Sequence, residues 1–238
     1  KIVMKIEIWS DIMCPFCYIG KRNFEIALEK FKDKNHVQVE WKSFQLDPTL
    51  PDIAADSQAD YLAKRKGMSI EQVEGLLQHV TQSAKAVGLD YQLDKAIMVN
   101  SFKAHRLIQK AKEKNIGDKA EEVFFQAFFI DSKNIADLEV LSQLGKKIGL
   151  SPTEIDEALS DDRFAYLVNQ DIQEAQNLGI NGVPFFVFDR KYGISGAQPP
   201  QAFVQTLEKA FAEWREKNPE TKLEISTGEQ CSIDGNCE

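Results

Sequence analysis

The chain opens with alternating apolar and polar positions on either side of a segment with helical periodicity. Residues 4–9 and 37–44 alternate and contain β-branched side chains, which is typical of strands. Between them, apolar residues recur at helical spacing, so we predict a helix from Cys14 to about Phe31. Pro15 favours this start, because a proline at the first helical position loses no hydrogen bond. The first part of the chain is therefore predicted to be strand, helix and strand.

From about residue 57 to 178 the pattern is helical throughout. Ser69 with Gln72, and Ser151 with Glu154, match the capping-box spacing at two predicted helix starts. Glycines lie where four of these helices are expected to stop, at Gly67, Gly88, Gly149 and Gly179. Phenylalanines form one strongly apolar stripe, predicted to lie in the core of this helical block, at Phe124, Phe125, Phe128 and Phe129.

After Gly179 the spacing of apolar residues is again that of strands. Residues 183–188 form an apolar strand, residues 192–195 a short antiparallel partner, and a last helix runs from the prolines at 199 and 200 to about Lys217. The whole order is β-α-β, a helical block, then β-β-α. This is the order of an α/β, thioredoxin-like fold with an inserted all-helical domain.

The domain boundaries follow from this order. We expect residues 1–56 and 179–217 to form the thioredoxin-like domain and residues 57–178 to form the helical insertion. Residues 218–238 are polar and are predicted to be a C-terminal tail, which contains the cysteines Cys231 and Cys237.

Composition and charge exclude several classes of protein. The hydrophobic fraction of 43% is enough for a core, and the formal net charge is −8 without a basic run, so we expect no nucleic-acid partner. No stretch approaches the roughly 18 apolar residues of a membrane span, and no leader of the secretory type is evident at the start. We therefore expect a cytoplasmic protein without a membrane partner.

The strongest chemical signal is the motif Cys14-Pro15-Phe16-Cys17 at the predicted start of a helix. Unpaired backbone N–H groups and the helix dipole stabilise a thiolate there, and the thiolate is the reactive form. Cys14 is expected to be the exposed, attacking cysteine, and Cys17, one turn further on, the buried one that resolves the mixed disulfide. The spacing thus indicates disulfide exchange.

A structural disulfide and a zinc site are the alternatives for these cysteines. A Cys₄ zinc site would need Cys231 and Cys237, whose spacing is longer than is usual for zinc ligands. We therefore expect neither a metal nor another cofactor.

A second feature is the segment Gly182-Val183-Pro184-Phe185. A proline at the start of an apolar strand cannot donate to the ladder, so it marks an edge or a special peptide bond. A cis Val183–Pro184 bond would aim the backbone of Val183 outward, where an incoming peptide could pair with it.

Four segments in order resemble the DsbA-like oxidoreductases, and within them the FrnE subgroup. They are residues 9–22 around the two cysteines, residues 100–107 (NSFKAHRL), residues 182–186 (GVPFF) and residues 195–199 (SGAQP). The resemblance spans nearly the whole chain. It departs from the commoner motif at Phe16, where tryptophan is frequent, but a bulky aromatic residue is kept.

This resemblance implies a thioredoxin fold with a helical domain over the active site, a redox pair at Cys14 and Cys17, and a cis Val183–Pro184 bond. It implies protein thiols and disulfides as substrates, and glutathione or a thioredoxin-type reductant as candidate electron donors. A second redox pair is implied at Cys231 and Cys237, with an incidental exposed pair as the alternative.

Three further expectations concern residues around the motif. By the same resemblance, His105 and Arg106 lie near the active site and, with Phe16, are candidates to hold substrate or a glutathione-like anion. A helix-surface or capping role is the alternative for His105 and Arg106. Asp11 is expected to cap the helix, and Glu7 is a weak candidate for a buried proton acceptor behind Cys17.

Two other functions remain open at this point. One is a glutathione-dependent isomerase or transferase of the kappa-like fold, which would need only a single hydroxyl residue at the first motif position. The other is a non-enzymatic adaptor or chaperone. The absence of histidine between the cysteines leads us to expect a dithiol less oxidising than the periplasmic DsbA proteins.

Overall fold

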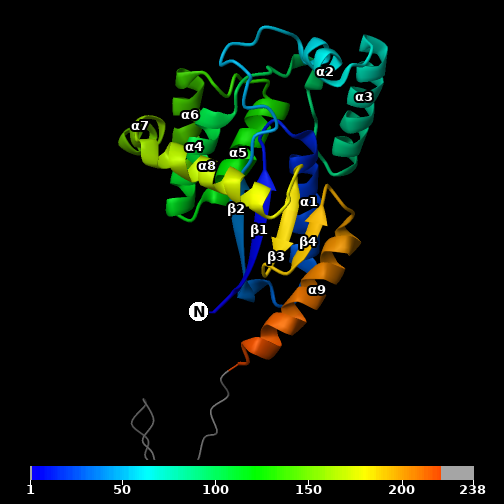
Figure 1. Cartoon of the computed structure of the whole chain (residues 1–238), viewed down its shortest axis with the longest axis vertical. Helices are drawn as coiled ribbons and strands as arrows, with labels where there is room; N and C mark the ends of the chain where they lie inside the picture. The colour runs from blue at the N-terminus through cyan, green and yellow to red at the C-terminus, as the bar shows by residue number, and fades with distance from the viewer. Residues whose placement is uncertain (1, 221–238) are drawn as a thin grey trace, which may run out of the picture.

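A four-stranded sheet forms the centre of residues 2–220, the part of the chain that this computed structural model describes. Its strands lie in the order β2-β1-β3-β4 (Figure 1). β1 runs parallel to β2 and antiparallel to β3, and β3 is antiparallel to β4. The bounds are Met4–Ser10 for β1, Val37–Ser43 for β2, Phe185–Phe188 for β3 and Tyr192–Ser195 for β4. The mixed α/β, thioredoxin-like fold predicted from the sequence is confirmed.

The helices divide into those that flank the sheet and those inserted between β2 and β3. The flanking helices are α1 (Pro15–Lys30) and α9 (Pro200–Lys217). The inserted helices are α2 (Gln58–Lys66), α3 (Ile70–Ala86), α4 (Phe102–Glu113), α5 (Gly117–Phe129), α6 (Leu138–Ile148), α7 (Pro152–Ser160) and α8 (Asp162–Asn177). Two single 3₁₀ turns, Lys34–His36 and Leu93–Lys95, are also present in the described part of the chain.

The alternation in the strands decides what covers each face of the sheet. Ile6 and Ile8 of β1 share a core with Phe24 of α1 and Phe203 of α9. Trp9 points to the opposite face, where α8 and the segment after it supply Ala175 and Ile180. Successive side chains of a strand point to opposite faces, so one strand contributes to both cores.

The core of the insertion is made chiefly by α4, α5, α6 and α7 and continues into the reactive turn and the start of α1. The four phenylalanines predicted to be buried there are fully buried. The pair α2 and α3 stands apart from α4–α8, above the start of α1 (Figure 1). α2 and α3 contact each other, and α3 contacts α1, so this pair reaches over the end of α1 that carries the cysteines.

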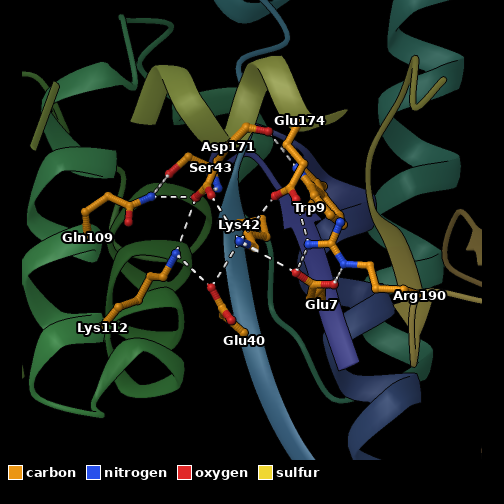
Figure 2. A network of polar contacts seen from close by, with 10 residues as sticks. All are labelled: Glu7, Trp9, Glu40, Lys42, Ser43, Gln109, Lys112, Asp171, Glu174 and Arg190. Carbon is orange, nitrogen blue, oxygen red and sulfur yellow. Dashed lines mark hydrogen bonds and ion pairs between the residues drawn. The ribbon is translucent and has the colours of Figure 1, made fainter. Parts of the chain in front are cut away.

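A network of charges joins the insertion to the sheet (Figure 2). Lys42 of β2 lies 3.1–3.6 Å from the carboxylates of Glu7, Glu40, Asp171 and Glu174. Burial alone would lower the pKa of Lys42, but the surrounding carboxylates raise it well above its usual range. Asp171 of α8 also accepts hydrogen bonds from the backbone N–H of Ser43 and from Gln109, at 2.9 and 2.6 Å. The network therefore fixes α4 and α8 against β2.

Local sequence patterns predicted most ends of the helices and strands correctly. Both predicted capping boxes are present, at Ser69 and Ser151. The four predicted stop glycines have positive φ, the left-handed region that glycine enters without steric cost. β3 starts at Phe185, two residues later than predicted, since Val183 and Pro184 form the approach to the strand. Among residues 2–220, no helix combines the length and the apolar character that crossing a membrane would require.

Candidate functional site

The two cysteines lie at the first turn of α1. Cys14 is the N-cap residue, with an extended backbone, and Pro15 occupies the first helical position. The Cys17 N–H lies 3.0 Å from the Cys14 carbonyl oxygen, so the turn is closed around the motif. Both cysteines are free thiols. Their placement at a strand-to-helix corner agrees with the sequence prediction.

Burial distinguishes the cysteines, although less than expected. Cys17 has no exposed surface, as predicted for the resolving cysteine, but Cys14 is only 4% exposed. The prediction of an exposed tip was wrong, because the helical insertion covers the end of α1. A substrate must therefore reach Cys14 through an opening between the two parts of the fold.

The electrostatics of Cys17 favour its thiol form. Burial raises the pKa of Cys17 well above its usual range, and the neighbouring Cys14 sulfur raises it further as a hydrogen-bond acceptor and as a charge. Smaller opposing effects come from the backbone of Asp11 and the side chain of Ser10. Cys17 consequently keeps its proton, which leaves Cys14, at the start of α1, as the candidate nucleophile.

The segment before β3 faces the cysteines. The Val183–Pro184 peptide bond is cis, as the family resemblance implied, and the Cys14 thiol lies 3.3 Å from the Val183 carbonyl oxygen. Gly20 of α1 makes this approach feasible, since a Cβ there would lie 3.0 Å from the Pro184 side chain. The Gly196 N–H donates to the Pro184 carbonyl oxygen at 2.8 Å. The structure thus brings these three resemblance segments together, and the fourth meets the first where His105 Nε2 lies 3.2 Å from Asp11 Oδ1.

A cavity of about 470 Å³ opens beside Cys14, between the start of α1 and the α2–α3 pair. Phe16, which is 38% exposed, lines this cavity, and its substrate-binding role stays a prediction. Arg65 and Lys66 supply positive charge at the α2 side. Most of the other lining residues are apolar, among them Met13, Leu46, Leu62, Leu77, Val80 and Met98.

Aromatic residues of α1 and the insertion hold the motif in place; sequence reasoning found the buried Phe125 and Phe129 but missed Tyr18 and Tyr91. The Tyr91 hydroxyl donates to the Pro15 carbonyl oxygen at 2.7 Å, and its ring stacks on Phe129. Tyr18 of α1 stacks on Phe125 and donates to Glu122 at 2.6 Å. Tyr91 lies in a loop outside any periodic pattern, so no local signal marked it.

His105 and Arg106 do not lie where direct substrate binding would need them. The His105 side chain has no exposed surface, and its Nε2 lies 3.2 Å from Asp11 Oδ1. Arg106 donates to the carbonyl oxygens of Ala158 and Asp161, at 2.7 and 2.9 Å, at the end of α7. These contacts do not favour direct substrate binding by either residue, and that role stays a prediction. The Arg106 contacts are those of the capping alternative.

Asp11 and Glu7 also take other roles than expected. The start of α1 has no side-chain cap, and the buried Asp11 carboxylate accepts from the Leu46 N–H at 2.8 Å instead. Glu7 pairs with Arg190 and Lys42 on the α8 face of the sheet. Because this face is opposite to that of α1, Glu7 cannot accept a proton from Cys17.

The predicted second redox pair, Cys231 and Cys237, lies outside the described residues, and so does the zinc site that would use it. Within residues 2–220, no three or more His, Cys, Asp or Glu side chains are grouped so that they could hold a metal ion.

The fold and the dithiol define a thioredoxin-like protein with a helical insertion. A family model described as the DSBA-like thioredoxin domain matches residues 5–208, and the chain therefore belongs to this family. It is similar to a solved structure from Streptomyces coelicolor described as a probable DsbA oxidoreductase. The two are 37% identical, with a TM-score of 0.83, over 99% of this chain and 98% of the other.

Two further similarities are more distant. An uncharacterized protein of Bacillus subtilis, YwbO, is 28% identical over 212 residues, which cover 87% of this chain and 96% of the relative. The cytosolic disulfide reductase DsbM of Pseudomonas aeruginosa is 15% identical, with a TM-score of 0.63, over 88% of this chain and 99% of DsbM. At that identity the likeness shows the fold alone.

Proposed function

We propose that this protein is a dithiol–disulfide oxidoreductase that exchanges disulfides with protein substrates. The observation that carries the proposal is the reactive turn: Cys14 at the start of α1, the protonated Cys17 behind it and the Val183 carbonyl opposite. This arrangement supplies a nucleophile, a resolving thiol and an edge of backbone for a peptide.

The exchange follows from the positions of the two sulfurs. The Cys14 thiolate attacks one sulfur of a substrate disulfide, so that a mixed disulfide forms and the other substrate sulfur leaves as a thiolate. Cys17 then gives up its proton, which neutralises a released substrate thiolate, and attacks the Cys14 sulfur. The second substrate sulfur leaves, and the Cys14–Cys17 disulfide is formed. Run in reverse, the same steps oxidise a substrate dithiol.

The cavity beside Cys14 supports a substrate with an apolar residue next to its cysteine. Burial of a leucine-sized side chain contributes about 1.5–3 kcal/mol, and the lining offers leucines, a valine and two methionines. Lys66, with no ion-pair partner in the described part of the chain, adds a preference for an acidic group nearby. The substrates would thus be protein segments with an apolar residue and an acidic group close to the reacting cysteine.

The decisive experiment replaces Cys17 by serine. The Cys17→Ser variant should retain attack by Cys14 and accumulate mixed disulfides with protein substrates, while turnover in insulin reduction is lost. A Cys14→Ser variant should trap nothing. If Cys17→Ser keeps full glutathione-dependent isomerase activity, the kappa-like alternative is correct. If partners bind equally well without both cysteines and no thiol turnover is measured, the protein is an adaptor.

Three finer assignments belong to this proposal. The four ordered segments support the FrnE subgroup, and in that subgroup Cys231 and Cys237 would act as a second pair that exchanges electrons with the first. We place the reaction in the cytoplasm, with glutathione or a thioredoxin-type protein as reductant. Fractionation of cells with the alkylated protein tests the compartment, because a periplasmic pool would contradict it.

The redox potential is a further part of the proposal. No histidine stands between the cysteines to stabilise the Cys14 thiolate, so we expect a couple less oxidising than DsbA. Equilibration of the dithiol with glutathione measures the potential. A value near −120 mV, as in DsbA, would contradict this expectation.

A further inference from the structure

Behind the reactive turn lies a buried group of ionisable side chains that disulfide exchange, as described above, does not use. His105 of α4 and Asp11 before α1 are both fully buried, with His105 Nε2 3.2 Å from Asp11 Oδ1. A carboxylate at this distance requires a proton on Nε2. The other ring nitrogen, Nδ1, is buried and has no hydrogen-bond partner. The fold thus leaves one ring nitrogen of His105 without a polar partner in this buried group.

Glu121 of α5 belongs to the same group. Its side chain is 1% exposed, and neither of its carboxyl oxygens has a hydrogen-bond partner. Burial raises the pKa of Glu121 to about 7; the nearby His105 and Lys21 oppose this rise, whereas Asp118 and Asp11 add to it. A carboxyl group in this state gains and loses its proton near neutral pH.

The group is in direct contact with the reactive turn. The Asp11 carbonyl oxygen accepts from the Cys14 N–H at 2.9 Å, and the backbone of Asp11 also hydrogen-bonds to Cys17. Lys21, which is 2% exposed, lies one turn after Cys17 on α1. The charged groups that face Glu121 thus come from the turn (Asp11), from α1 (Lys21), from α4 (His105) and from α5 itself (Asp118).

We propose that Glu121 holds an exchangeable proton whose binding depends on whether Cys14 and Cys17 are oxidised or reduced. Glu121 acts as a positioning residue for the dithiol, because it does not touch the reacting sulfurs. The inference rests on the proposed function, since it needs a Cys14–Cys17 pair that is oxidised and reduced.

The chemistry balances as follows. Two glutathione molecules reduce the Cys14–Cys17 disulfide, and glutathione disulfide is formed. One of their protons ends on Cys17, and the other is released when Cys14 takes the reactive thiolate form, which a helix start stabilises. The new negative charge at Cys14 raises the proton affinity of groups in the same poorly screened interior. Glu121 therefore takes up part of the released proton in the reduced protein.

Linkage fixes the direction of the pH effect. At low pH Glu121 is protonated in both redox states and does not oppose the Cys14 thiolate. At high pH its carboxylate is charged and disfavours the reduced form. Glutamine resembles protonated Glu121 in size and charge. The Glu121→Gln variant therefore lacks the negative charge that disfavours the reduced form at high pH. The variant should match the wild type at low pH and be more readily reduced at high pH.

The test is the equilibrium between the protein and glutathione from pH 5.5 to 8.5. All chains carry Cys231→Ser and Cys237→Ser, so that a single dithiol titrates. The reduction equilibrium constant of Glu121→Gln, divided by that of the unsubstituted chain, should rise from about 1 to about 10 if the redox-linked change in proton affinity is one pKa unit. The exposed Glu139→Gln should give a ratio independent of pH. A flat ratio for Glu121→Gln would overturn the inference.

A second measurement needs no substitution at Glu121. Infrared difference spectra of oxidised and reduced chains at pH 7 should show a gain in protonated-carboxyl absorption on reduction, and its absence contradicts the inference. Failure of the proposed function gives a different result, because the cysteines would then not equilibrate with glutathione at any pH.

Discussion

The Cys14 thiol donates a hydrogen bond to the Val183 carbonyl oxygen, 3.3 Å away, although 169 positions separate the two residues in the chain. The contact joins the start of α1 to the segment that leads into β3. It places the reactive sulfur against the stretch of backbone that we propose for substrate pairing. An incoming peptide and the resting Cys14 thiol would therefore compete for hydrogen bonds to the backbone at Val183.

The apolar cavity should determine which peptides react fastest with Cys14. Leu77→Ser adds a polar group to the lining, so the preference for leucine over serine next to the substrate cysteine should fall by about tenfold in kcat/KM. Reaction with glutathione alone should not change. The matched control is Leu138→Ser, an exposed leucine on α6. An unchanged peptide preference in Leu77→Ser would exclude the cavity as the binding site.

Arg106 should contribute to stability and not to substrate binding. Arg106→Ala leaves the carbonyl oxygens of Ala158 and Asp161 without their charged donor. We expect a loss of about 1–3 kcal/mol in the free energy of unfolding, measured in urea. The rate of insulin reduction by the folded variant should equal that of the wild type. A raised KM at unchanged stability would restore the substrate-binding hypothesis.

Removing one charge from the network in Figure 2 should weaken the attachment of the insertion. Asp171→Asn takes a carboxylate from Lys42 and Lys112, which lie 3.4 and 3.3 Å away. Uncompensated buried charge is costly, and we expect a loss of roughly 3 kcal/mol in stability. The exposed Asp156→Asn on α7 serves as control. Equal unfolding midpoints for the two variants would show that the network does not stabilise the fold.

The stability of the protein should fall as Glu121 becomes charged. Its pKa of about 7 in the folded protein exceeds the ordinary 4.5, so the stabilisation is complete below pH 4.5 and is lost as the pH rises through 7. Relative to the wild type, Glu121→Gln should gain up to about 3 kcal/mol between pH 5 and 8.5. Urea unfolding at the two pH values measures this gain. Parallel pH profiles would mean that Glu121 does not titrate in this range.

The sequence predicted the fold well because local rules decide most of it. Strand alternation, the capping boxes at Ser69 and Ser151, and Pro15 at a helix start act within a few residues of themselves. The same rules identified Cys14 and Cys17. They could not predict that Cys14 is buried, because the residues that cover it come from a different part of the chain.

The polar residues of the site were harder to predict for the same reason. Arg106 meets carbonyl groups 52 and 55 positions away, and Tyr91 reaches back 76 positions to Pro15. Glu121 carries no periodic or motif signal that separates it from the acidic residues on either side. Such roles depend on which helix faces which, and that arrangement is set by packing across the whole insertion.

The tryptophans provide a consequence for spectroscopy. The indole N–H of Trp9 donates to the Asp171 carbonyl oxygen of α8, and that of Trp41 donates to Asp118 of α5, at 2.8 and 3.0 Å. Two of the three tryptophans of the chain are thus bonded to the insertion, while Trp214 lies in the core between α1 and α9. Intrinsic fluorescence consequently carries two separable signals. Emission from Trp9 and Trp41 reports whether the helical insertion is seated on the sheet, and emission from Trp214 reports whether the sheet domain itself is intact.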